Sequence, residues 1–88
     1  MKKRINGRVY DTETAQWVVK WSNSLPMSDF GWAEETLYQK KTKEYFLHGE
    51  SGPMGKYAKY NEDNSIGYGE DIIPLTDDEV EEWLSKLV

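Results

Sequence analysis

The clearest pattern of hydrophobic and polar positions lies in the last thirteen residues, 76–88. Apolar side chains recur there at the spacing of one helical stripe, at Val80, Trp83, Leu84, Leu87 and Val88. Thr76 and Glu79 fit a capping box, in which a hydroxyl and a carboxylate three residues apart bond the free amides of a helix start. The pattern predicts a capped amphipathic helix that packs by its Trp–Leu side and turns its carboxylates to water.

A second helix is predicted at about residues 12–23. Asp11 can cap its start, and Glu13 lies where the helix dipole favours a carboxylate. One stripe of this helix would hold Ala15, Val18, Val19 and Ser22. Trp17 and Trp21 lie beside that stripe and have two interpretations, either as a wider core-facing surface or as partly exposed anchors for a partner.

Strands are expected in most of the remaining chain. Asn6-Gly7 is a turn signal for an N-terminal hairpin or edge strand. A hairpin at about 32–49, closed around Thr42-Lys43, would place Tyr38 opposite Leu47 and Gln39 opposite Phe46. Such a hairpin has apolar groups on both faces, so the sequence leaves dimerisation through an exposed face as an alternative.

The region between this hairpin and the final helix is the least regular. Residues 48–69 are predicted as a Gly-rich connection with a single helical turn at 56–60, and residues 70–75 as a last strand. The fold class expected from all these elements is α+β in one domain, residues 1–88. Its two helices should pack on one face of a small antiparallel sheet.

Charge is unevenly distributed along the chain. The net charge is −5. Residues 1–60 carry ten Lys or Arg and seven Asp or Glu, whereas residues 61–88 carry one Lys and nine Asp or Glu. Such an acidic end repels nucleic acid and attracts basic protein surfaces. The alternative is that these charges serve solubility alone.

Few residues suggest catalysis or metal binding. The chain has no cysteine and one histidine, His48, with Glu50 close by as a possible acid–base partner. A strand-end histidine with a structural role is the simpler interpretation. The acidic run at 61–65 lacks the glycine and terminal glutamate of a calcium loop. The sequence therefore predicts no catalytic, cofactor or metal site, and without an apolar spanning run or signal segment it predicts a cytoplasmic protein.

Five segments form a pattern over most of the chain: Ile5-Asn6-Gly7, Tyr10-Asp11-Thr12-Glu13-Thr14-Ala15, Glu35-Thr36-Leu37-Tyr38, Glu44-Tyr45-Phe46-Leu47-His48-Gly49-Glu50 and Ile73-Pro74-Leu75-Thr76. The pattern resembles a group of short, mostly uncharacterised proteins of phages, plasmids and other bacterial mobile elements. Related chains have Gly in the hairpin turn and after Glu50, where this chain has Lys43 and Ser51. The resemblance implies an inhibitor of host defence, of the anti-CRISPR kind.

The function predicted from charge and resemblance together is non-enzymatic inhibition of a nucleic-acid-handling effector, such as a Cas nuclease, by an acidic surface that mimics DNA. The predicted partner-binding residues are Glu70, Asp71, Asp77, Asp78, Glu81, Glu82, Trp17 and Trp21. The alternative is an accessory regulator that binds nucleic acid through its basic positions, Lys2, Lys3, Arg4, Arg8, Lys40, Lys41 and Lys43. A small enzyme that uses His48 and Glu50 is a third hypothesis.

Overall fold

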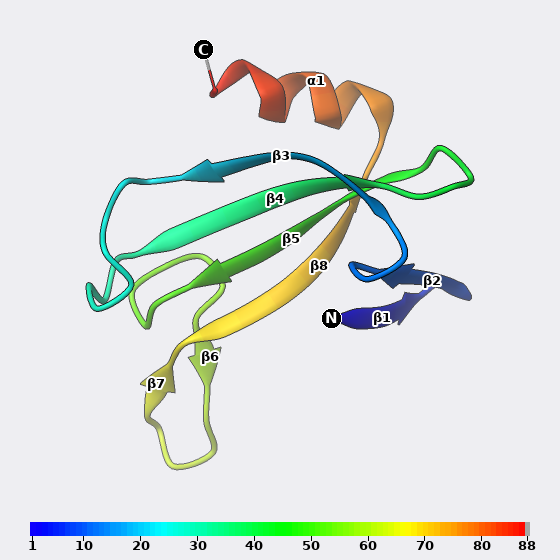
Figure 1. Ribbon diagram of the computed structural model, residues 1–88. Helices are drawn as coiled ribbons and strands as arrows, with labels where there is room; N and C mark the ends of the chain where they lie inside the picture. The colour runs from blue at the N-terminus through cyan, green and yellow to red at the C-terminus, as the bar shows by residue number, and fades with distance from the viewer. Residues whose placement is uncertain (88) are drawn as a thin grey trace.

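The computed structural model describes residues 1–87 and consists mainly of β-strands, with one helix in that range (Figure 1). The elements are β1 (Lys2–Ile5), β2 (Arg8–Asp11), β3 (Gln16–Ser22), β4 (Ala33–Gln39), β5 (Tyr45–Ser51), β6 (Lys59–Tyr60), β7 (Ile66–Gly67), β8 (Gly69–Leu75) and α1 (Asp77–Ser85). Four antiparallel strands form the central sheet in the order β3-β4-β5-β8, and β1-β2 and β6-β7 form two further hairpins. The predicted α+β fold with two helices is therefore wrong, because its first helix is a strand.

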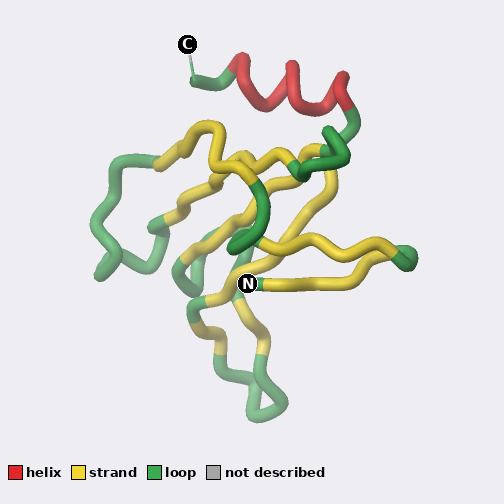
Figure 2. Tube along the Cα trace, turned by 45° about the vertical axis from the view of Figure 1, so that its right-hand side comes forward, coloured by secondary structure: helices red, strands yellow, loops and turns green. Residues whose placement is uncertain are grey.

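The two faces of the central sheet are covered differently. On the first, here called the helix face, α1 lies over the sheet (Figures 1 and 2), and its Val80 and Trp83 pack on Leu37 and Leu47. On the second, here called the hairpin face, Tyr10 of β2 packs on Phe46 and Ile72. Because side chains alternate along a strand, neighbouring core residues such as Phe46 and Leu47 belong to opposite faces. The hydrophobic core is therefore two thin layers on either side of one sheet.

The final helix is confirmed, together with its capping box. Thr76 Oγ1 accepts a hydrogen bond from the Glu79 amide at 3.2 Å, and the Thr76 amide donates to Glu79 Oε1 at 2.9 Å. Val80 and Trp83 are buried, whereas Leu84 is 37 % exposed. The predicted stripe is thus narrower than expected, and its last member, Val88, lies outside the described residues.

The predicted helix at 12–23 is instead a turn followed by strand β3. Asp11 caps a turn, not a helix: its Oδ1 accepts from the Glu13 amide at 2.9 Å and its carbonyl accepts from the Ala15 amide at 3.1 Å. Asp caps turns and helices by the same kind of bond, so the local signal does not distinguish them. The following segment, Trp17–Trp21, is rich in β-branched and aromatic residues, which favour a strand that packs on a neighbour.

The hairpin of β4 and β5 is confirmed, but its predicted register is wrong by one residue. Tyr38 lies opposite Phe46, and Leu37 lies opposite Leu47. The turn is longer than the expected two residues because Lys43 adopts a left-handed conformation, with φ of 77°, and its amide bonds the Lys40 carbonyl. A one-residue shift moves side chains between faces. It places Leu37 and Leu47 together under α1.

The other strand predictions have mixed outcomes. The N-terminal hairpin is confirmed, with Asn6 and Gly7 both at positive φ in its turn, and the strand at 70–75 is confirmed as β8. The helical turn expected at 56–60 is wrong, since Lys59 and Tyr60 form β6 and pair with β7.

Candidate functional site

The outer side of α1 presents a row of carboxylates. The burial of Val80 and Trp83 fixes the rotation of the helix about its axis, which turns Asp77, Asp78, Glu81 and Glu82 outward, and all four are exposed. Within residues 1–87 none of the four takes part in an ion pair. This row is here called the acidic row, and its negative potential is not cancelled by a contacting cation of the described chain.

The chain's basic side chains are largely committed elsewhere. Within residues 1–87, six of them form ion pairs: Lys3 with Asp71, Arg8 and Lys40 with Glu44, Lys20 with Glu34, and Lys56 and Lys86 with Glu35. Lys86 is the C-cap residue of α1 and reaches inward to the sheet, with its Nζ 2.8 Å from the Glu35 carboxylate. Because these basic side chains pair with other carboxylates, none of them neutralises the acidic row by an ion pair.

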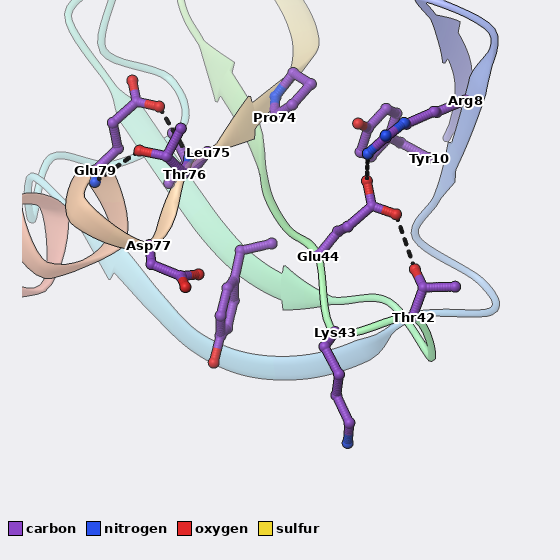
Figure 3. A pocket seen from close by; sticks show the side chains of 11 residues that line it. Arg8, Tyr10, Thr42, Lys43, Glu44, Pro74, Leu75, Thr76, Asp77 and Glu79 are labelled. Atoms are coloured by element: carbon purple, nitrogen blue, oxygen red, sulfur yellow. Dashed lines mark hydrogen bonds and ion pairs between the residues drawn. The ribbon is translucent and has the colours of Figure 1, made fainter.

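A cleft of about 360 Å³ opens between the start of α1, the β4-β5 turn and the β1-β2 hairpin (Figure 3). Arg8 Nη1 donates to Glu44 Oε2 at 2.7 Å, and Thr42 Oγ1 donates to Glu44 Oε1 at 2.9 Å. The Arg8 hydrogen bond lowers the pKa of the Glu44 carboxyl below its usual value. Arg8, Thr42 and Glu44 therefore satisfy one another, and the cleft is better explained as a junction between elements than as a ligand site.

The remaining predicted partner-binding residues do not join the acidic row. Glu70 lies at the opposite end of β8 from α1, beside His48, and Asp71 is held by Lys3 at 2.5 Å. Trp21 packs in the helix-face core, with the Lys86 ammonium 4.6 Å from its ring centre. Trp17 is 56 % exposed, opposite Tyr38 in the register. Of the two tryptophans, only Trp17 has the exposure of an anchor.

A buried carboxylate, Glu35, was not singled out by the sequence. Its side chain is 2 % exposed on the helix face. Oε1 accepts hydrogen bonds from Trp83 Nε1 at 2.9 Å and Lys86 Nζ at 2.8 Å, and Oε2 accepts from Lys56 Nζ at 3.3 Å and from the Tyr57 hydroxyl. Burial raises the pKa of Glu35, but the donors from Lys86, Tyr57 and Trp83 outweigh it and lower the pKa to about 2.

The loop that follows β5 is shaped to bring Tyr57 to this carboxylate. Glu35 lies opposite Gly49 in the register, and the Tyr57 ring occupies the space where a Cβ of Gly49 would stand. The Tyr57 amide donates to Ser51 Oγ at 2.8 Å, which fixes the loop on the strand. Burial and the Glu35 carboxylate raise the pKa of the Tyr57 hydroxyl, so it stays a donor. Glu35 thus connects β4, the loop and α1.

A second polar cluster lies on the hairpin face. His48 Nε2 is 3.7 Å from Glu50 Oε1 and 3.8 Å from Glu70 Oε2. The sequence placed His48 near Glu50, and the structure confirms that proximity and adds Glu70, which is brought in by strand pairing. Nε2 is fully shielded from solvent and has no hydrogen-bond partner in the described chain.

A signal for Glu35 was present in the sequence. It shares strand parity with Ala33 and Leu37, so a charged residue stands between two apolar positions of one strand face. Glu70 gave no comparable signal, because its contact with His48 depends on the pairing of β5 with β8.

Comparison of the chain with protein-family models, with curated proteins and with solved structures finds no match. Among the described residues, no helix has the length and apolar character needed to cross a membrane. The function therefore has to be inferred from the geometry of this chain.

Proposed function

We propose that the protein acts by binding, and that the acidic row of α1 docks into a positively charged nucleic-acid channel of an effector protein. The observation that carries the proposal is that four exposed carboxylates on one helix have no ion-pair partner within residues 1–87, whereas six basic side chains pair with acids elsewhere. A pre-formed row of negative charge complements a channel that binds phosphates. Occupation of the channel would exclude the nucleic acid.

The packing of α1 supports this role. Trp83 is anchored at once by the apolar core and by its hydrogen bond to Glu35, and Lys86 ties the end of the helix to the same carboxylate. The helix is therefore held at both ends, by the capping box and by these contacts. A rigid surface loses little conformational entropy on binding, which favours affinity.

The proposed partner is an effector of bacterial defence, a Cas nuclease or complex, and the protein is proposed to act in the bacterial cytoplasm as an inhibitor of the anti-CRISPR kind. This part of the proposal combines the acidic row with the resemblance to mobile-element proteins. Effectors of this class hold nucleic acid in basic channels.

The test is a gel shift of a Cas effector with its target DNA, at increasing concentrations of the protein. We expect inhibition of DNA binding that weakens as salt rises, because screening reduces attraction between exposed charges. The double variant Glu81→Gln/Glu82→Gln should lose at least tenfold in potency. The matched control, Glu13→Gln/Glu62→Gln, removes two exposed carboxylates away from α1 and should keep full potency. Equal potency of the two variants would contradict the proposal.

The alternative of nucleic-acid binding has one supporting observation. Lys2, Lys40 and Lys41 line a groove of about 350 Å³ beside the N-terminal hairpin. Against it, Lys3 and Arg8 are engaged in ion pairs, and Asp11 lines the same groove. Titration of the protein with labelled DNA and RNA at low salt separates the two functions, since tight binding would favour the regulator and its absence the inhibitor.

A further inference from the structure

The strand pairing of β5 with β8 brings one histidine and two glutamates together on the hairpin face. Glu50 and Glu70 lie directly opposite each other in the register. His48 precedes Glu50 by two residues, so it projects from the same face of the sheet. The three donor atoms, His48 Nε2, Glu50 Oε1 and Glu70 Oε2, all lie within 4.8 Å of one another.

The electrostatics of this cluster are unbalanced. Like charges directly opposite each other on paired strands are destabilising. Glu34 lies opposite Glu50 on its other side, which puts three carboxylates in a row across β4, β5 and β8. Lys20 neutralises Glu34, with 2.8 Å between Nζ and Oε2. In the described chain, no Lys or Arg forms an ion pair with Glu50 or Glu70.

The histidine gives a second, independent observation. Buried polar atoms in proteins are almost always hydrogen-bonded, and each exception calls for an explanation. His48 Nε2 is the one buried side-chain nitrogen or oxygen in the described residues that has no hydrogen-bond partner. It lies 3.7 and 3.8 Å from the two carboxylate oxygens, which is too far for a hydrogen bond.

We propose that His48, Glu50 and Glu70 bind a divalent transition-metal ion, of which zinc fits best. An ion with bonds of about 2.1 Å in tetrahedral geometry holds its ligands about 3.4 Å apart. The two distances from His48 Nε2, 3.7 and 3.8 Å, lie close to that value, and the two carboxylate oxygens lie within 4.8 Å of each other. An imidazole nitrogen in the set selects zinc and its neighbours over magnesium and calcium, which prefer oxygen ligands alone. The ion gives Nε2 a partner and neutralises the facing carboxylates.

The site would also join two strands. β5 lies inside the central sheet, and β8 lies at its edge and leads into α1. An ion bound by Glu70 and by the two β5 residues links the edge strand to the interior of the sheet. Three protein ligands leave one tetrahedral position for water or for a donor from another molecule. This inference does not depend on the acidic row.

The first test is the melting temperature of the tag-free full chain, treated with chelator and then titrated with ZnCl₂ or MgCl₂ at neutral pH. Because a ligand stabilises the state that binds it, we expect a rise of about 5 °C or more with zinc at saturation, and little change with magnesium. Glu70→Gln should weaken zinc binding at least tenfold. Glu62→Gln removes a distant exposed carboxylate and should leave it unchanged. Equal zinc responses in the two variants, or an equal response to magnesium, would overturn the assignment.

The second test uses the fact that His48 is the only histidine in the chain. Its ring nitrogens therefore give unambiguous signals in a ¹⁵N spectrum. Addition of ZnCl₂ should shift the Nε2 signal in the native chain and in Glu62→Gln, but not in Glu50→Gln/Glu70→Gln. The side chains of the two substituted glutamates are 38 % and 49 % exposed, so the double variant is expected to fold. A native spectrum without a zinc-induced shift at Nε2 would refute the site even if zinc binds elsewhere.

Discussion

The two faces of the central sheet differ in whether their buried polar group has hydrogen-bond partners. On the helix face, the buried carboxylate of Glu35 receives four donors, from Lys56, Tyr57, Trp83 and Lys86. On the hairpin face, His48 Nε2 is equally shielded but has no partner within residues 1–87. Both groups come from the middle strands β4 and β5, so position in the sheet does not explain the difference.

What covers each face explains the difference. The helix face is closed by α1 and the loop after β5, and both elements supply donors to Glu35. The β1-β2 hairpin contributes Tyr10 and Ile5 to an apolar cluster around Phe46 and Ile72, and no bond of the described residues reaches His48 Nε2. The buried polar group of the helix face therefore finds its partners within the protein, whereas the hairpin face has a polar position that an external ion can fill.

The largest effect is expected from substitution of Glu35, the buried carboxylate of the helix face. Glu35→Gln keeps the shape of the side chain but replaces the buried carboxylate with an uncharged amide, and Lys86, whose side chain is 41 % exposed, loses its ion-pair partner. Removal of one partner of a buried ion pair costs about 3–5 kcal/mol. Urea unfolding should report that loss, whereas Glu34→Gln, which breaks a more exposed pair with Lys20, should cost about 1 kcal/mol or less. Similar losses in both variants would show that burial is not the reason for the contrast.

The pH dependence of stability should show the same asymmetry, with a somewhat smaller effect. The pKa of Glu35 is lowered from 4.5 to about 2 in the folded chain. Its contribution to stability is therefore complete above pH 4.5 and disappears as the pH falls toward 2, a loss of about 3 kcal/mol. The free energy of unfolding, measured from pH 6 to pH 2, should fall less steeply in Glu35→Gln than in the native chain. Parallel curves would contradict the assignment.

The smallest effect is expected on the hairpin face, where His48 Nε2 has no hydrogen-bond partner within residues 1–87. With chelator present, Glu70→Gln removes the repulsion between Glu70 and Glu50, so the free energy of unfolding should stay level or rise by about 0.5 kcal/mol. Thermal unfolding of Glu70→Gln beside Glu62→Gln measures this. A clear destabilisation without metal would mean that Glu70 already has a favourable partner inside the protein.

The parts of the fold that depend on neighbouring residues were predictable, and those that depend on distant pairing were not. The capping box of Thr76 and Glu79 is a local device, so the final helix could be located from the sequence. The bonds that Asp11 makes are just as local but serve a turn as well as a helix. The apolar positions of 15–22 fit a helical stripe, which predicts a helix where the chain forms β3.

The hairpin register and the polar clusters could not be predicted from the sequence, for related reasons. The left-handed conformation of Lys43 adds a residue to the turn, and a lysine there gives no sign of it. That one residue decides that Leu37 and Leu47 share a face with Glu35. The partners of Glu35 come from positions 21 to 51 residues away, and Glu70 reaches His48 only through β5-β8 pairing.

The irregularity in β3 bears on how the protein behaves when it is crowded. β3 forms one border of the central sheet, and its ladder to β4 shifts between Trp17 and Val19. A bordering strand with an unbroken row of amides and carbonyls is a template on which another chain can grow, and a bulge bends that row out of line. The shift therefore hinders edge-to-edge strand pairing between molecules, so the exposed edge strand can be tolerated at high concentration.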